Sequence, residues 1–280
     1  MTTASPAEPA TPAGATPAAT PANTASAASP APPGNTTTPA PPATEATEAT
    51  PATPATPATP AIILAGGRGS RLDGAAKPLL EIDGRTLLDR AVAAVAGCDP
   101  IIVVGPQAPV NGVVVWTRET PEFGGPVAGI AAGLAASTAA STSSSTDTST
   151  STSTSTSTEV YVLAADLPNA EEAVALLRQH PPLASGEDGI CLTDESGRMQ
   201  WLIGRYRTDA LRAAVSALPD SGRDASIRSL LAGLAITSLS AGDLATDVDT
   251  WDDLERARAT TQARASAGNP RSSALDEETT

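Results

Sequence analysis

The sequence predicts an α/β fold in three layers, a mostly parallel sheet with helices on both faces. Two observations predict it. Between residues 61 and 258, short apolar runs alternate with segments whose apolar residues recur at helical spacing. The apolar runs show no alternation with polar residues, which is typical of strands buried on both faces of a parallel sheet.

The first half of this pattern supplies four strands and two helices. The run Ala-Ile-Ile-Leu-Ala at 61–65 ends in two glycines and predicts a buried strand that leads into a turn. Residues 86–96 place apolar side chains on one helical face, and residues 126–136 are Ala-rich with proline at the first helical position. Further buried strands are expected at 101–104, 113–116 and 160–165, the last of which ends at Asp166.

The second half continues the alternation. Strands are expected at 189–193, 201–204 and 235–239, and helices at 171–179, 209–218, 226–232 and 251–258. Because crossovers between parallel strands are right-handed, the carboxyl ends of these strands share one edge of the sheet, where ligands bind. We therefore expect the turn after the first strand and Asp166 to meet in one cleft.

Two tails flank this domain of 61–258, and one low-complexity loop interrupts it. Residues 1–60 consist mainly of Ala, Thr and Pro and contain no Lys, Arg or aromatic residue, so we expect a disordered tail. Residues 137–158 are almost entirely Ser and Thr and predict a low-complexity loop inside the domain. The polar residues 259–280 predict a second disordered tail.

Charge and composition exclude several classes of function. The chain carries 31 acidic and 17 basic residues, a formal net charge of −14, with no Lys/Arg-rich run, which argues against nucleic-acid binding. No apolar run is long enough to span a membrane, and the N-terminus has no signal-peptide pattern. Two cysteines far apart in sequence suit a reducing compartment, so a cytoplasmic location is expected.

The turn at 64–77 carries the chemistry. It is neither a P-loop nor a dinucleotide fingerprint, because the required Gly-Lys-Ser/Thr and the third spaced glycine are missing. Its four glycines nevertheless let backbone N–H groups wrap around phosphate oxygens. Arg68, Arg71 and Lys77 add positive charge in an otherwise acidic chain, so the turn predicts a phosphate-binding site.

Four motifs resemble a known family. Leu64-Ala65-Gly66-Gly67, followed by Arg71, Lys77 and Pro-Leu-Leu-Glu, resembles the nucleotidyltransferase signature. Within that class the chain looks like the molybdenum cofactor guanylyltransferase family. The family's other motifs are similar to Gly124-Gly125-Pro126-Val127-Ala128-Gly129, Asp166-Leu167-Pro168 and Asp247-Val248-Asp249-Thr250-Trp251-Asp252-Asp253-Leu254.

The resemblance implies a Rossmann-like three-layer nucleotidyltransferase fold and a set of site residues. The catalytic residues would be Arg71 and Lys77, which neutralise phosphate charge, and Asp166, which holds Mg²⁺. The nucleotide would contact Leu64, Ala65, Gly66, Gly67, Lys77, Glu119 and Asp166.

The resemblance also implies a reaction. GMP would pass from GTP to molybdopterin, with Mg²⁺ present, forming the guanine dinucleotide cofactor and releasing pyrophosphate. The alternatives are cytidylyl transfer to molybdopterin, nucleotidyl transfer to another small phospho-acceptor, and an inactive nucleotide-binding homologue. The expected partners are GTP and molybdopterin, with no nucleic acid or membrane. We expect a monomer or weak oligomer that contacts cofactor-synthesis or molybdoenzyme-maturation proteins transiently.

Some positions depart from the family pattern or stay undecided. Asp73 stands where the family usually has glycine, Ala76 where it has aspartate, and Trp251 where it has proline. The departures at Asp73 and Ala76 are the reason to keep the inactive homologue as an alternative. Structural and ligand roles are evenly weighed for Asp247 and Asp249, which precede a sequence typical of a capping box. Further positions have two interpretations each, as pterin contacts or as structural residues: Gln200, Trp201, Ser226 and Arg228.

Overall fold

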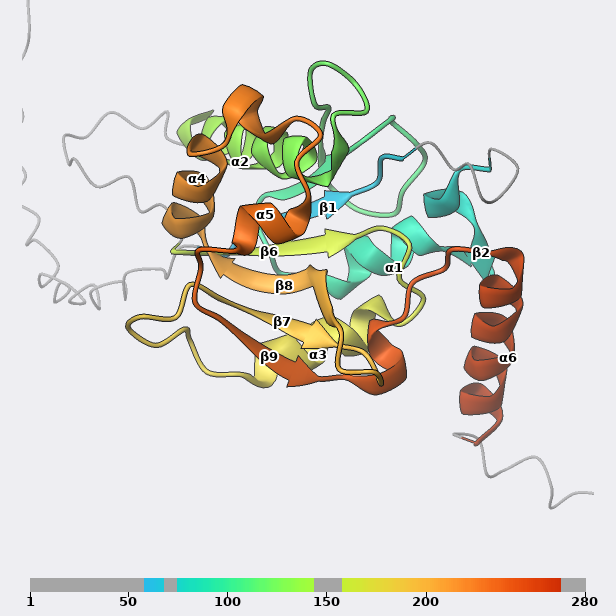
Figure 1. Ribbon diagram of the computed structural model, residues 1–280. Coiled ribbons are helices and arrows are strands. Elements are labelled where there is room, and N and C mark those ends of the chain that lie inside the picture. The colour runs from blue at the N-terminus through green and yellow to red at the C-terminus, as the bar shows by residue number, and fades with distance from the viewer. Residues whose placement is uncertain (1–57, 68–74, 144–157, 268–280) are drawn as a thin grey trace, which may run out of the picture. The chain divides into compact units, whose positions relative to one another are not determined.

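The computed structural model describes residues 58–67, 75–143 and 158–267. Seven strands form one sheet in the order β5-β4-β1-β6-β8-β7-β9 (Figure 1). The strands are β1 (Ala61–Leu64), β4 (Ile101–Val104), β5 (Val115–Thr117), β6 (Glu159–Ala164), β7 (Gly189–Thr193), β8 (Met199–Arg207) and β9 (Ile236–Ser240). The strand pairs of the sheet are parallel except those that involve β8, so the predicted α/β fold with a mostly parallel sheet is confirmed.

Helices cover both faces of the sheet (Figure 1). They are α1 (Leu87–Ala94), α2 (Gly125–Ser143), α3 (Ala170–Gln179), α4 (Thr208–Ser216), α5 (Ile227–Leu231) and α6 (Trp251–Ala267). Ile63 of β1 joins the core under α1 and α3, while its neighbour Ile62 joins the core under α2, α4 and α5. Alternate residues of β1 are therefore buried on opposite faces, which is why the strand is apolar throughout.

Several predicted boundaries were wrong. The strand predicted at 113–116 begins at Val115, since Val113 is 94% exposed, and β8 extends well beyond the predicted 201–204. The helix predicted at 126–136 continues to Ser143, inside the predicted Ser/Thr loop, and the one predicted at 251–258 continues to Ala267, inside the predicted tail. Residues 58–60 of the predicted first tail are described, and Thr59 and Pro60 accept backbone hydrogen bonds from the domain. Residues 1–57, 144–157 and 268–280 lie outside the described residues, and the domain limits stay predictions.

A small hairpin was not predicted. Strands β2 (Glu81–Ile82) and β3 (Arg85–Thr86) pair with each other before α1. Ile82 and Leu87 pack with Val248 and Leu254 in a small third core. This core attaches the hairpin to the C-terminal segment and so brings the region after Lys77 close to residues 247–254.

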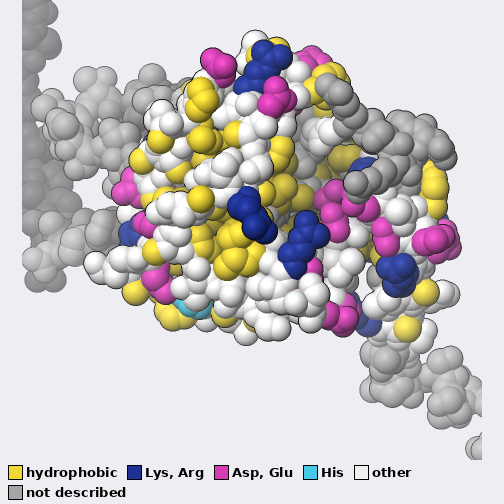
Figure 2. Space-filling view, in the orientation of Figure 1, with side chains coloured by type: hydrophobic (Ala, Val, Ile, Leu, Met, Phe, Trp, Pro, Cys, Tyr) yellow, Lys and Arg dark blue, Asp and Glu magenta, His cyan; other side chains and the backbone are white. Residues whose placement is uncertain are grey.

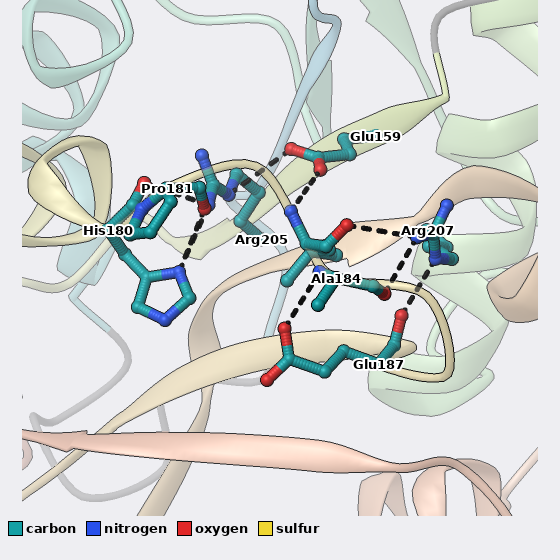
Figure 3. Close-up of polar contacts among 8 residues, drawn as sticks. Glu159, His180, Pro181, Ala184, Glu187, Arg205 and Arg207 are labelled. Carbon is teal, nitrogen blue, oxygen red and sulfur yellow. Dashed lines mark hydrogen bonds and ion pairs between the residues drawn. The ribbon is translucent and has the colours of Figure 1, made fainter.

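Two arginines of β8 fix the loop after α3 at the edge of the sheet opposite the carboxyl ends of the parallel strands (Figure 3). Arg205 lies 3.3 Å from Glu159 and donates to the carbonyl oxygens of His180 and Pro181. Arg207 donates to three further carbonyl oxygens of the loop, those of Leu183, Ala184 and Glu187. His180 therefore belongs to a structural network. Among the described residues, no helix has both the length and the apolar composition needed to cross a membrane.

Candidate active site

The turn after β1 presents backbone N–H groups that have no acceptor among the described residues. Leu64 and Ala65 still belong to the sheet, because Ala65 N donates to Val104 O at 2.8 Å and Leu64 O accepts from Ala165 N at 3.0 Å. Gly66 and Gly67 are exposed, and within the described residues their N–H groups have no acceptor. Unpaired N–H groups in succession suit an anion. The rest of the turn, with Arg68 and Arg71, lies outside the described residues.

A cavity of about 310 Å³ opens over this turn. Gly66 and Gly67 line one side, and the start of α2 lines another with Gly125, Pro126 and Gly129. Glu119 also lines it, and its Oε1 accepts from Phe123 N at 3.1 Å, which fixes the carboxylate. The remaining lining residues are Leu64, Val104, Phe123, Ala164, Asp166 and Leu202. The structure thus brings the glycine turn and Asp166 to one cavity, as the topology predicted, and Glu119, which the family resemblance indicated, lines it too. Ala65 is buried.

Asp166 follows β6, and its backbone holds the segment at 247–249 in place. Its backbone oxygen accepts from Val248 N at 3.0 Å, and Val248 is buried. This one hydrogen bond sets Asp247 and Asp249, the two neighbours of Val248, beside Asp166. One carboxylate oxygen from each of the three aspartates lies within 4.8 Å of the others. The sequence left the roles of Asp247 and Asp249 undecided, and the structure places both against Asp166.

The acidic cluster is electrostatically strained. Burial, together with the charge of Asp247, raises the pKa of Asp166 to about 6. Burial and the charge of Asp249 also raise the pKa of Asp247. Lys77 forms an ion pair with Asp249, and its Nζ lies 3.9 Å from Asp166 Oδ2. One ammonium group thus faces three carboxylates.

The donor set of this cluster suits a hard divalent cation. Asp166 Oδ1 is buried and has no hydrogen-bond partner among the described residues, although buried carboxylate oxygens are normally paired. Mg²⁺ prefers one or two carboxylates together with phosphate oxygens and water. Asp166, Asp247 and Asp249 are therefore the residues that could hold such an ion.

A second cavity, of about 550 Å³, lies on the other side of Asp166. It shares Ala164, Asp166 and Leu202 with the first cavity, and Asp247 lines it as well. Its other lining residues are Leu167, Gly197, Arg198, Met199, Gln200, Trp201, Ile203, Ser226, Ile227 and Arg228. Figure 2 shows basic and acidic side chains close together on the face turned to the viewer. Molecules bound in the two cavities could therefore both reach Asp166.

The structure brings the four positions with two interpretations to one cavity. Gln200, Trp201, Ser226 and Arg228 all line the second cavity, and Arg198 lines it too, although no sequence pattern indicated Arg198. Ser226 also caps α5, since its side chain accepts from Ser229 N at 3.1 Å.

The capping box before α6 is real. Asp253 Oδ2 accepts from Thr250 N at 2.8 Å, and Thr250 Oγ1 accepts from Asp253 N at 3.2 Å. The box fixes the backbone immediately after Asp249. Capping and the placement of an acidic side chain in the cluster are therefore compatible in this segment.

The fold and the two cavities around one carboxylate cluster define an α/β protein of the nucleotidyltransferase class. The model of the family described as "MobA-like NTP transferase domain" matches residues 61–238, and the chain belongs to that family. A molybdenum cofactor guanylyltransferase of Acidiphilium cryptum is 60% identical over 37 residues, which are 13% of this chain. The match spans only 19% of that relative's length.

A solved structure shows the same fold. The chain is similar to a homologue of Mycobacterium tuberculosis Rv0371c from Mycobacterium sp. strain JC1, with a TM-score of 0.50 and 20% identity. That match covers 74% of this chain and 98% of the other. The 2-C-methyl-D-erythritol 4-phosphate cytidylyltransferase of Thermus thermophilus matches with a TM-score of 0.49 and 19% identity, over 73% of this chain and 99% of its own.

Proposed function

We propose that the protein transfers GMP from GTP to molybdopterin, forming the guanine dinucleotide cofactor and releasing pyrophosphate in a Mg²⁺-dependent reaction. The observation that carries the proposal is the position of Asp166, which lines both cavities and lies beside Asp247 and Asp249. Family membership and the name of the Acidiphilium relative support the choice of substrates.

The first cavity is the proposed nucleotide site. The free N–H groups of Gly66 and Gly67 donate to phosphate oxygens, and Lys77 neutralises part of the triphosphate charge. Leu64 and Glu119 line the same cavity and contact the nucleoside, while Ala65 supports the turn from below. We assign Arg71 to the phosphates on the strength of the sequence motif alone, because it lies outside the described residues.

Asp166, with Asp247 and Asp249, is the proposed holder of Mg²⁺. The bound ion supplies Lewis-acid stabilisation of phosphate charge and a template for both substrates. The three carboxylates fix where that charge is neutralised. Lys77, next to Asp166 and Asp249, offsets part of the negative charge of the cluster.

The second cavity is the proposed acceptor site. An oxygen of the acceptor's terminal phosphate attacks the α-phosphorus of GTP, and the bond from that phosphorus to the bridging oxygen of the β-phosphate breaks. Pyrophosphate leaves with the bond electrons. The attacking phosphate is already ionised at neutral pH, so the protein needs no general base and acts by positioning and charge stabilisation.

The proposal includes the location of the protein and its partners. A cytoplasmic location suits the free Cys98 and Cys191. We propose a monomer or weak oligomer that hands its product to molybdoenzyme-maturation proteins by transient contact.

Pyrophosphate release tests the function. The protein is mixed with Mg²⁺, molybdopterin and one of GTP, CTP, ATP or UTP, and the nucleotide product is identified by mass. Of the four nucleotides, we expect only GTP to release pyrophosphate in this mixture. Preference for CTP would make the protein a cytidylyltransferase, and GTP binding without release would make it an inactive homologue.

A further inference from the structure

The turn that joins β7 to β8 is organised by one carboxylate. Asp194 Oδ1 accepts from Ser196 N at 2.9 Å, from Ser196 Oγ at 2.6 Å and from Arg198 N at 3.0 Å. The hydrogen bonds from Ser196 and Arg198 lower the pKa of Asp194. Three donors converge on Oδ1, so the group at that position must be an oxygen.

The other oxygen of the same carboxylate holds a glutamine. Gln200 Nε2 donates to Asp194 Oδ2 at 2.8 Å. A carboxylate only accepts hydrogen bonds, so it fixes which end of the Gln200 amide turns toward it. Gln200 lines the second cavity, and no described residue donates to its Oε1.

An irregularity in the sheet places Gln200 at the cavity. Cys191 of β7 pairs with Gly204 of β8, but the next residue of β7, Leu192, pairs with Gln200. Trp201, Leu202 and Ile203 are therefore left without partners on β7, and all three line the second cavity. Pairing between the two strands resumes at Gln200, which anchors the backbone of this residue at the cavity wall. Irregularities of this kind re-aim side chains beside active sites.

We propose that Gln200 is a specificity-determining residue for the acceptor, and that Asp194 is the positioning residue that sets its orientation. With its nitrogen held by Asp194, Gln200 offers an oxygen to the cavity. That oxygen accepts a hydrogen bond from a ring N–H or amino group, such as those of a 2-amino-4-oxopteridine. The inference rests on the proposed function, because it assumes that the second cavity takes the acceptor.

A single substitution separates this role from turn stability. In Asp194→Asn, the three converging donors keep the new amide oxygen at the Oδ1 position, so its NH₂ group faces Gln200. Two donors then oppose each other, and the Gln200 amide rotates to turn its oxygen toward the asparagine. The turn stays intact, but the cavity receives NH₂ where it had an acceptor.

A second substitution restores the acceptor. In the double variant Asp194→Asn with Gln200→Glu, one carboxylate oxygen accepts from the new asparagine and the other faces the cavity. A merely structural role for Asp194 would not predict this rescue. The matched control is Asp209→Asn, an exposed aspartate in the first turn of α4 that carries the same charge but lies away from the cavity.

Binding of neopterin, a 2-amino-4-oxopteridine, is measured by calorimetry for the four proteins, with melting temperature as a check of folding. We expect Asp194→Asn to bind about tenfold more weakly than wild type, since a desolvated donor loses its acceptor. The double variant should return to within about threefold of wild type, and Asp209→Asn should bind as wild type does.

Three results would overturn the inference: no neopterin binding by wild type, unchanged binding by Asp194→Asn, or no recovery in the double variant. The pyrophosphate assay separates the two proposals. If wild type binds neopterin and the double variant recovers, the assignment of Gln200 holds even when GMP transfer is absent, and only the proposed function fails.

Discussion

At the scale of single residues, the site depends on the ammonium group of Lys77, which contacts two carboxylates of the acidic cluster. Lys77 is the only lysine in the 280-residue chain. It forms an ion pair with Asp249 and lies 3.9 Å from Asp166 Oδ2, with its side chain 19% exposed. Lys77 therefore lies against the acidic cluster, and the proposed function requires its ammonium group to face a phosphate as well.

Replacing Lys77 by methionine should slow the reaction by about 10²–10³-fold, the usual cost of removing one group that stabilises charge in the transition state. Steady-state pyrophosphate release measures the effect. Lys77→Arg keeps the charge and should recover part of the rate. Wild-type turnover by Lys77→Met would show that this ammonium does not face the reacting phosphates.

Asp166→Asn should abolish the stabilisation of the protein by Mg²⁺. Without metal at pH 7.5, Asp166 is ionised, because this pH lies above its folded-state pKa of about 6. Burial and the charge of Asp247 raise that pKa from its ordinary value of 3.8, so the ionised carboxylate destabilises the folded protein. The variant should therefore melt higher than wild type in EDTA. Saturating Mg²⁺ should raise the melting temperature of wild type by roughly 5–10 °C and leave that of the variant unchanged.

Asp209→Asn serves as the control for the metal experiment, since it removes an exposed carboxylate outside the cluster. Its melting temperature should respond to Mg²⁺ as that of wild type does. Equal Mg²⁺ shifts in wild type and Asp166→Asn would contradict the metal site.

Part of the site was predictable residue by residue. Gly66, Gly67 and Asp166 each follow a buried strand, and parallel topology alone brings such residues to one edge. The partnership of Asp166 with Asp247 and Asp249 was not predictable, because it depends on the hydrogen bond from Val248 N to Asp166 O, between residues far apart in sequence.

At the scale of elements, helix α2 reaches the site because it packs unusually close to β1. A Cβ atom on Gly133 would lie 2.6 Å from Ile62 Cγ2, and one on Gly129 would lie 3.1 Å from Leu64 Cδ2. These two glycines let the helix axis approach the strand. The start of α2 is thereby held at the first cavity, next to the glycine turn.

Gly133→Val should destabilise the fold by about 1–3 kcal/mol, because the added methyl groups meet Ile62 in a packed core. Urea unfolding measures the loss. Gly233→Val is the matched control, since a Cβ there meets no atom within 4 Å, and its effect should stay within about 0.5 kcal/mol. Equal stability of the two variants would refute close packing of α2 on β1.

The central strands were predictable, and the outer elements were less so. Burial on both faces makes β1, β4 and β6 continuous apolar runs that can be recognised in the sequence. The extension of β8 through Arg205 and Arg207 was missed, because these polar residues owe their place to carbonyl groups of a distant loop. The extension of α6 is likewise supported from outside, by Arg264, which donates to Asn169 Oδ1 at 2.8 Å and to Asp243 Oδ2 at 2.7 Å.

At the scale of the whole molecule, the residues just before β1 are tied to the sheet. Thr59 O accepts from Asp99 N at 3.2 Å, and Pro60 O accepts from Tyr161 N at 3.0 Å. The family match begins at residue 61. We therefore predict that folding needs the chain from about residue 59 onward.

Deleting residues 1–57 should leave the melting temperature within about 2 °C of the full chain and turnover unchanged, because the acceptors at Thr59 and Pro60 remain. Thermal melting and the pyrophosphate assay check this. Deleting 1–60 removes both acceptors and should lower the melting temperature. A large loss from the shorter deletion would mean that the segment before Thr59 contributes to folding or activity.

The proposed function needs two anions to bind near Asp166, which lines both cavities, although the chain has a net charge of −14. In this proposal local groups offset the acidic field: the N–H groups of the glycine turn, Lys77 and a divalent cation for the nucleotide, and Arg198 and Arg228 for the acceptor. The central claim is that a nucleoside triphosphate lies against Lys77 in the first cavity.

Acylation of the single lysine tests that claim most directly. The protein is treated with an amine-reactive ester, and modification of Lys77 is followed by mass spectrometry of its peptide, with the N-terminal amine as internal reference. We predict that Mg²⁺ with GTP slows modification of Lys77 at least about tenfold, while the N-terminal amine reacts as before. An equal rate at Lys77 with and without Mg²⁺ and saturating GTP would contradict the account.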